Sequence, residues 1–379
     1  MKEIYYDNSA TTKIDPRVLE AMLPFLQDSF SNPSSLHSFG KVARNAVELA
    51  RQQIAECVGA QPHEILFTSC GTESDNWAIK STAYARRDRG MHLITSCIEH
   101  PAVLNCFAFL EREGFSASLL PVDKYGRVSV DDLRAFISPG TTVVSVMMAN
   151  NEVGTIQDVK LLAEVAHEHS VVMHTDAVQA IGHIPVNVID LGVDLLSASA
   201  HKFNGPKGVG FLYKRAGISL PSMMDGGHQE FGVRGGTENV AGIVGMACAL
   251  NNHVTNLRQN ICHIDRLATL IRSRVLAYIP EAKFNGCPSQ RLPGLISLSL
   301  VGVSAESVLH LLDLKRIFVS TGAACNSRNT AISHVLQALN LPIDHSVGTL
   351  RISLSKDTTE AEALTIADTI VSLYFKLYK

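Results

Sequence analysis

One stretch of sequence, Ser199-Ala200-His201-Lys202-Phe203-Asn204-Gly205-Pro206-Lys207-Gly208, decides how this chain is interpreted. Apolar runs with strand character precede it at 194–198 and follow it at 209–213. Lys202 is then either an ordinary surface lysine in a β-hairpin, since most lysines are exposed, or an amine held at a strand end for chemistry. The rest of the chain has to distinguish these two interpretations.

Short apolar runs alternate with helical stretches through the first two-thirds of the chain. Continuous apolar strands in such alternation are typical of a mainly parallel sheet with helices on both faces. The expected strands are 64–69, 92–96, 117–122, 142–148, 171–175, 195–198 and 208–213. The expected helices are 42–58, 72–86, 102–112, 130–136 and 159–168. We therefore predict an α/β fold built on a seven-stranded sheet.

The last third of the chain has a different pattern. It is helical from Asn239 to about Ala277, with a possible break near Val254. Strand-like runs then appear at 295–300, 317–320 and 349–354, with helices at 305–312, 332–339 and 360–377. We predict a large domain at 15–257 and a smaller α+β domain made of 1–14 and 258–379, which carries a loop of small and polar residues at 321–331.

Composition and charge exclude several classes of protein. With 379 residues, 46% hydrophobic residues and a net charge of −3, the chain has no electrostatic preference for nucleic acid or membrane surfaces. No apolar run approaches the roughly 18 residues of a membrane helix. The eight cysteines form no C-x-x-C pair, so no metal site is expected. Because residues 1–7 lack the apolar core of a signal peptide, we expect a cytoplasmic protein with reduced cysteines.

Polar residues follow several of the predicted strands. Gly71-Thr72, His100, Asn151, Asp176 and Lys202 each stand at or just beyond a strand's carboxyl end. Each position also has a plainer interpretation as a helix cap or a turn residue. Ligands of parallel sheets bind beyond the carboxyl ends of the strands, so the repetition favours a shared site.

The chemistry of these residues fits a phosphorylated ring cofactor. Backbone N–H groups at the helix start near Gly71 and Thr72 can bind a phosphate. The His100 imidazole can stack on a ring and transfer protons near neutral pH. The Asp176 carboxylate can keep a ring nitrogen protonated, which makes the ring an acceptor of electrons.

Ordered motifs extend along nearly the whole chain. They are Tyr6-Asp7-Asn8-Ser9-Ala10-Thr11-Thr12, Thr72-Glu73-Ser74-Asp75-Asn76, Glu99-His100, Asn150-Asn151-Glu152-Val153-Gly154, His174-Thr175-Asp176-Ala177-Val178-Gln179, Ser199-Ala200-His201-Lys202 with Gly205-Pro206-Lys207-Gly208, Arg234-Gly235-Gly236-Thr237, Ser320-Thr321-Gly322-Ala323-Ala324-Cys325 and Leu350-Arg351-Ile352-Ser353. Together they resemble the class V, aspartate-aminotransferase-like enzymes that use pyridoxal 5'-phosphate (PLP). More narrowly, they resemble the NifS/IscS group of cysteine desulfurases. The resemblance implies the PLP-dependent transferase fold.

The resemblance also implies how the cofactor is bound. Lys202 would bind PLP covalently, Asp176 would pair with the pyridine nitrogen, and Gln179 would contact the ring oxygen. His100 and Asn151 would contact the ring as well. The phosphate ligands would be Gly71, Thr72, Ser199 and His201, with Thr237 reaching in from a second subunit. A site shared in this way implies a homodimer.

Cys325 is the implied sulfur-accepting nucleophile. Small residues precede it and polar residues, including Arg328, follow it. That setting is poor for a core cysteine and typical of an exposed thiol, and a nearby arginine favours the reactive thiolate. Asn151 and Arg351 would orient the substrate, and His100 would move its protons.

The implied reaction is PLP-dependent removal of sulfur from L-cysteine. Its products would be L-alanine and a persulfide on Cys325, which passes to an acceptor protein for iron–sulfur cluster assembly, tRNA thiolation or DNA phosphorothioation. Two alternatives remain at this point. One is a selenocysteine lyase or another class V reaction, and the other is a sulfur carrier without turnover.

Three positions depart from the pattern of the group. Cys70 replaces a small residue, Asn204 a bulkier one and Gly235 a common serine. The chain also stops at Lys379, soon after the last predicted helix. We therefore do not expect the tail with which housekeeping members bind an iron–sulfur scaffold.

Overall fold

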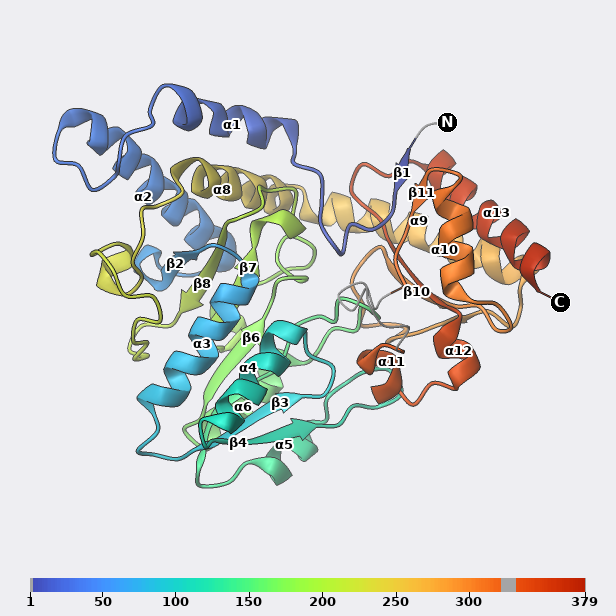
Figure 1. Ribbon diagram of the computed structural model, residues 1–379, viewed down its shortest axis with the longest axis horizontal. Helices are drawn as coiled ribbons and strands as arrows, with labels where there is room; N and C mark the ends of the chain where they lie inside the picture. The colour runs from blue at the N-terminus through green and yellow to red at the C-terminus, as the bar shows by residue number, and fades with distance from the viewer. Residues whose placement is uncertain (1–2, 322–331, 379) are drawn as a thin grey trace.

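The computed structural model describes residues 3–321 and 332–378. Figure 1 shows two bodies, with the N-terminal strand lying among C-terminal elements rather than beside α1. The large body contains β2–β8 and α1–α8, and the small body contains β1, β9–β12 and α9–α13. Cys325 lies outside the described residues.

The large body is built on a seven-stranded sheet in the order β2-β8-β7-β6-β5-β3-β4. Its strands are β2 Ile65–Thr68, β3 His92–Ser96, β4 Ser116–Leu120, β5 Thr141–Ser145, β6 Val172–Asp176, β7 Leu195–Ser199 and β8 Gly210–Lys214. Only β8 runs against its neighbours, pairing antiparallel with both β2 and β7. The other six strands therefore end at one common edge, and the predicted α/β fold with a mainly parallel seven-stranded sheet is confirmed.

Successive strand residues alternate between two hydrophobic cores. On β2, Ile65 and Phe67 pack into the core on one face, whereas Leu66 packs into a cluster on the other. On β5, Val144 and Val143 divide in the same way. This explains the continuous apolar runs in the sequence, because helices cover both faces.

The helices of the large body complete these cores. They are α1 Pro16–Gln27, α2 Ser38–Val58, α3 Gly71–Ala85, α4 Pro101–Arg112, α5 Val130–Phe136, α6 Val159–Glu168, α7 Val188–Leu191 and α8 Val240–Thr255. The predicted helices differ from these by a few residues at their ends. Helix α1 was not predicted, although Asp15 caps it through the Arg17 amide and Pro16 starts it.

The small body surrounds an antiparallel sheet in the order β12-β10-β9. Its strands are β9 Lys283–Phe284, β10 Leu295–Ser299 and β12 Thr349–Ser353, and β1 Ile4–Tyr5 pairs in parallel with β11 Ile317–Phe318. Its helices are α9 Leu257–Tyr278, α10 Ala305–Asp313, α11 His334–Ala338, α12 Ile343–Val347 and α13 Glu360–Leu377. Tyr6 belongs to the same hydrophobic core as α9 and α13.

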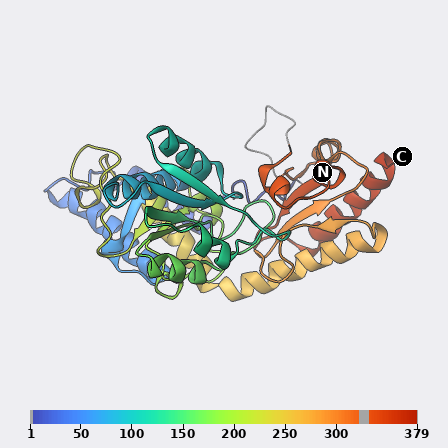
Figure 2. The same cartoon turned by 90° about the horizontal axis from the view of Figure 1, so that it is seen from below.

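Helices α8 and α9 connect the two bodies, with Asn256 between them. Figure 2 shows α9 extending from the large body along the small one. The predicted domain boundary at residue 257 falls at this junction and stays a prediction. None of the helices in residues 3–321 and 332–378 combines the length and apolar character that crossing a bilayer requires.

Candidate active site

A cavity of about 340 Å³ opens at the edge where the parallel strands end. It is lined by nearly all of the predicted site residues, namely Gly71, Thr72, His100, Asn151, Asp176, Gln179, Ser199, His201, Lys202 and Arg351. Ser9, Ala10, Cys70 and Asp75 also line it. The shared carboxyl edge brings together Gly71 and Lys202, which are 131 positions apart, and Arg351 joins them from outside this sheet.

Lys202 ends a single 3-10 turn, Ala200–Lys202, in the connection between β7 and β8. The hairpin interpretation was correct for the backbone, but the side chain points toward the N-terminal segment. Lys202 Nζ donates to the carbonyl oxygen of Ala10 at 3.0 Å and also to that of Ser9. The Lys202 carbonyl is itself held by His183 Nε2 at 2.9 Å. The amine is thus fixed at the cavity wall.

The start of α3 has the features of a phosphate site. Cys70 precedes the helix and makes no side-chain cap, so the first N–H groups of the helix are not taken up by it. A Cβ at Gly71 would lie 2.6 Å from Val178 Cγ2, so only glycine fits there. Ser199 Oγ is buried beside it and has no hydrogen-bond partner in the described part of the chain. An uncapped helix start and an unsatisfied buried hydroxyl fit the phosphate group of PLP.

Asp176 and His100 line the cavity from β6 and α4. Asp176 Oδ1 accepts a hydrogen bond from the Val178 amide at 2.8 Å, and burial raises the pKa of this carboxyl while the nearby His100 and Lys202 lower it. His100 Nδ1 accepts from the Ala102 amide at 3.1 Å, which leaves the proton of the neutral ring on Nε2. Burial lowers the pKa of His100, so the ring is neutral near pH 7.

A buried polar network lies behind Asp176, and no sequence pattern indicated a role for it. His174 bonds to Ser145 Oγ at 2.8 Å and to Ser197 Oγ at 3.0 Å, and Asp75 Oδ1 is 3.7 Å from its Nε2. Burial lowers the pKa of His174 to about 3 and raises the pKa of Asp75 well above its usual value. His174 is therefore neutral near pH 7, and burial together with the neighbouring Asp176 favours the protonated form of Asp75.

Glu99 is a second buried acid that sequence reasoning did not single out. Its Oε1 accepts hydrogen bonds from Ser96 Oγ at 2.5 Å and from the Met147 amide at 2.9 Å. Its Oε2 has no partner in the described residues, and burial raises its pKa to about 8. The position next to His100 was its only signal in the sequence.

The small body supplies Arg351 from β12. Arg351 Nη1 donates to the Asn151 carbonyl at 3.2 Å, and Nη2 donates to Asp7 Oδ1 at 2.8 Å. Gln179 Nε2 donates to the Ser9 carbonyl at 2.8 Å. Contacts from the segment around Ser9 and from β12 thus close the cavity on the side of the small body.

Two predicted residues are not placed in the cavity. Thr237 does not line it, and its predicted role concerns a second copy of the chain. Nearby Arg234 forms a forked ion pair with Glu73 of α3, at 2.9 and 3.2 Å, which ties this loop to the phosphate site. Cys325 lies outside the described residues.

Among residues 3–321 and 332–378, no three His, Cys, Asp or Glu side chains are grouped to bind a metal.

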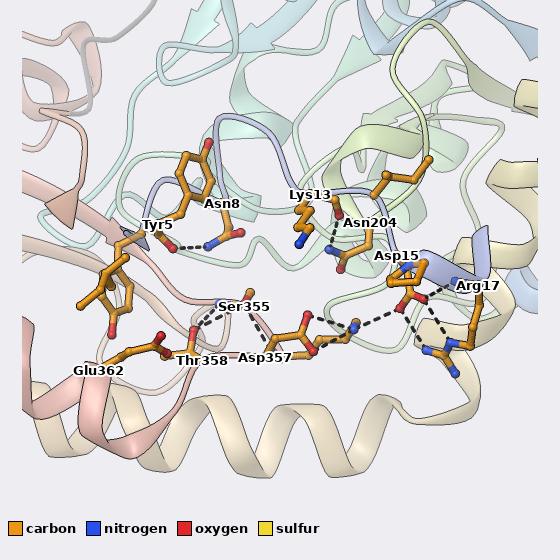
Figure 3. A pocket seen from close by; sticks show the side chains of 15 residues that line it. Tyr5, Asn8, Lys13, Asp15, Arg17, Asn204, Ser355, Asp357, Thr358 and Glu362 are labelled. Carbon is orange, nitrogen blue, oxygen red and sulfur yellow. Dashed lines mark hydrogen bonds and ion pairs between the residues drawn. The ribbon is translucent and has the colours of Figure 1, made fainter. Parts of the chain in front are cut away.

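A larger cavity of about 620 Å³ lies between the N-terminal segment and the turn before α13 (Figure 3). Its charged groups mostly neutralise one another. Arg17 and Lys356 both pair with Asp15, and Lys356 also pairs with Asp357. None of the predicted site residues lines this cavity.

Comparisons with known proteins agree with this geometry. The class V aminotransferase family model matches residues 4–365. The cysteine desulfurase IscS of Methanosarcina thermophila is 46% identical over 99% of this chain and 93% of its own length. The solved structure of a NifS-like protein superposes with a TM-score of 0.94 at 38% identity, covering 99% of this chain and all of that one. A second structure, SspA in complex with cysteine, has a TM-score of 0.82 at 35% identity and covers 94% of this chain and all of that one.

These similarities agree with the chemistry of the cavity. Class V aminotransferases are PLP enzymes, and the groups around Gly71, Ser199 and Lys202 fit that cofactor. Cysteine desulfurases act on L-cysteine. The match extends over nearly the full length of both chains, and the protein belongs to the cysteine desulfurases of the IscS/NifS group, within the class V aminotransferase family.

Proposed function

We propose that Lys202, His100 and Cys325 carry out the desulfuration of L-cysteine to L-alanine, with the sulfur received as a persulfide on Cys325. The observation that supports this most is the convergence on one cavity of Asp176 and Lys202, from neighbouring strand ends, and Arg351, from β12 of the small body. An amine, a buried acid and a guanidinium are the groups that an amino acid and a PLP ring require.

We assign the binding of PLP to residues of this cavity. Gly71, Thr72, Ser199 and His201 would hold the phosphate, Asp176 the ring nitrogen and Gln179 the ring oxygen. Lys202 would bind the cofactor covalently, with His100 and Asn151 against the ring. When bound, PLP supplies the acceptor for the electrons that are released at the substrate Cα.

The protein's own groups then move protons and sulfur. Lys202 Nζ removes the Cα proton of the substrate, and His100 exchanges a proton with the substrate thiol at Nε2. The thiolate of Cys325 attacks the substrate sulfur, so that an S–S bond forms as the Cβ–S bond breaks. The electron pair of the broken bond and a proton complete the methyl group of alanine, and Lys202 returns a proton to Cα.

The substrate carboxylate would bind Arg351 and Asn151. A guanidinium is a planar fork that suits a carboxylate, and the Arg351 side chain is only 5% exposed. Charge-assisted hydrogen bonds in such a dry site are stronger than those at the surface. Arg351 therefore fixes the orientation in which the Cα–H bond meets Lys202.

We further propose a homodimer in which Thr237 completes the partner's phosphate site. Large apolar side chains are exposed on and after α1, on α2 and in the loop after β8, namely Leu26, Phe30, Leu36, Leu49, Met223, Met224 and Phe231. Phe231 packs on Arg51 of α2, with the guanidinium 4.9 Å from the ring centroid, so this loop and α2 adjoin. A surface of this kind is typical of an interface between subunits.

The remaining proposals concern the cellular context. The acceptor of the Cys325 sulfur would be a protein that serves iron–sulfur cluster assembly, tRNA thiolation or DNA phosphorothioation. A net charge of −3 gives no support for direct contact with nucleic acid. A cytoplasmic location is supported by the seven cysteines of the described residues, which are all free.

The test is the production of alanine and sulfide from L-cysteine in the presence of dithiothreitol. Cys325→Ala should lose both products while keeping the bound cofactor. Cys262→Ala is the matched control, because Cys262 is an exposed cysteine on α9, and it should retain full activity. Equal activity of wild type and Cys325→Ala would show that Cys325 is not the nucleophile.

A further inference from the structure

Asp7 is a conspicuous residue of the N-terminal motif to which the mechanism gives no role. Its Oδ1 accepts a hydrogen bond from Arg351 Nη2 at 2.8 Å. The two side chains are 20% and 5% exposed, so water screens this ion pair only weakly. The inference below rests on the proposed role of Arg351 in binding the substrate carboxylate.

Not all N–H groups of the Arg351 guanidinium have a hydrogen-bond partner. Nη1 donates to the Asn151 carbonyl at 3.2 Å and Nη2 to Asp7, whereas Nε is buried and has no partner in the described residues. The backbone of Arg351 is fixed as well, because it exchanges hydrogen bonds with Ser320 at 2.6 and 3.1 Å. Because the Arg351 backbone is fixed, Asp7 and Asn151 determine the direction in which the Arg351 side chain points.

Asp7 is itself held in place. It forms a bridge with Ser353 of β12, and the neighbouring Asn8 Nδ2 donates to the Ser353 carbonyl at 2.8 Å. The Asp7 carbonyl accepts from the Tyr5 hydroxyl at 3.1 Å and from the Ala10 amide at 3.0 Å. The carboxylate thus lies on a fixed backbone beside the strand that carries Arg351.

No other carboxylate in residues 3–321 and 332–378 forms an ion pair with Arg351. Glu152 is the other acid that interacts with it electrostatically. Its Oε2 accepts a hydrogen bond from Ser333 Oγ, and burial raises its pKa. Within these residues, the Arg351 guanidinium therefore pairs with one carboxylate, that of Asp7, before any substrate binds.

We propose that Asp7 is a specificity-determining residue, which orients Arg351 and restricts its site to amino acids that carry a single negative charge. The substrate α-carboxylate adds a second negative charge to one guanidinium, and this is tolerated because Arg351 offers several donors. An additional anionic group on the side chain, such as a carboxylate or a sulfinate, would meet the net negative charge that Asp7 and the α-carboxylate leave around one guanidinium. L-Cysteine, with its neutral thiol, fits this restriction.

The test compares two ligands of the holoenzyme that differ in side-chain charge. L-Alanine and L-aspartate are titrated against the absorption of the bound cofactor, which gives a dissociation constant for each ligand. Wild type should prefer L-alanine, and Asp7→Asn should reduce that preference by about tenfold, since the amide keeps an acceptor for Nη2 but removes the charge. An unchanged ratio of the two constants in Asp7→Asn would overturn the proposal.

Two further variants separate this inference from the proposed function. Asp357→Asn removes an exposed carboxylate of the larger cavity and should leave the ratio unchanged. Arg351→Gln should weaken both ligands. If Arg351→Gln binds L-alanine as wild type does, the proposed role of Arg351 fails. If it binds weakly while Asp7→Asn keeps the wild-type ratio, only the role of Asp7 fails.

Discussion

The two cavities of this protein differ more in how their polar groups are satisfied than in how much space they enclose. The larger one, of about 620 Å³, is lined by charged side chains that mostly pair with each other (Figure 3). Arg17, for example, forms a forked contact with Asp15 and is 58% exposed. The smaller one, of about 340 Å³, contains the unpartnered Ser199 Oγ and the buried acids Asp75 and Asp176.

This difference favours the smaller cavity as the functional one. Buried polar groups are normally paired, because an unpaired one costs about 1–3 kcal/mol. In the described residues, three residues lining the smaller cavity have such an atom (Asp75 Oδ1, Ser199 Oγ and Arg351 Nε), against one lining the larger cavity (Tyr6 Oη). Volume alone would have selected the wrong cavity.

The largest expected difference between the cavities is between their lysines. Lys202→Ala should reduce turnover of L-cysteine by about 10³-fold or more, because it removes the group that we propose takes the Cα proton. Lys13→Ala, on the wall of the larger cavity, should keep activity within about twofold, as surface substitutions usually do. Steady-state kinetics on both variants measure the loss of turnover. A comparable loss in Lys13→Ala would contradict the proposed difference between the two cavities.

A smaller difference is expected between the arginines. Arg351→Lys should raise KM for L-cysteine by about 10- to 100-fold, because lysine lacks the fork and a charged hydrogen bond is worth roughly 1.5–3 kcal/mol. Arg17→Lys should leave KM unchanged, since Arg17 is bound to Asp15 and directed away from the chemistry. An increase in KM of the same size in both variants would show that the effect does not depend on the cavity in which the arginine lies.

The smallest effect concerns stability and its pH dependence. The pKa of Glu99 is about 8 in the folded chain against 4.5 for the free group. Between these pH values the folded state holds one more proton than the unfolded state, so this group lowers stability progressively as pH rises from about 4.5 to 8. Glu99→Gln removes that loss and should be more stable than wild type by about 1–3 kcal/mol at pH 8, with little difference at pH 4.5.

Thermal or urea unfolding of the holoenzyme at pH 4.5 and pH 8 measures this difference. Asp357→Asn serves as control, because that carboxyl is 72% exposed in the larger cavity and should show no such trend. A stability gain for Glu99→Gln that is equal at both pH values would contradict the assignment of a raised pKa.

The sequence alone predicted those site residues whose positions follow from local patterns. Lys202, Asp176, His100 and Thr72 stand next to strand ends that can be read from apolar runs, and parallel strands place their carboxyl ends together. Helix α1 was missed even though Pro16 and the Asp15 cap mark its start. Pro24 lies inside this helix, at a place where proline normally ends or kinks a helix.

Other parts of the site depend on tertiary contacts that no local pattern contains. Asp7 and Arg351 meet across 344 positions of sequence. Asp75, His174 and Glu99 acquire shifted pKa values only through burial, which depends on the packing of α3 and α4 on the sheet. The roles of Cys325 and Thr237 came from family resemblance, and they stay predictions.

The most direct test of the account is to locate the cofactor. Reduction of the holoenzyme with borohydride attaches PLP permanently to the amine that holds it, and peptide mass mapping then identifies that residue. The account predicts the label on the peptide that contains Lys202, and none on Lys13 or Lys356 of the larger cavity. A label on any other lysine, or a protein that binds no PLP, would contradict it.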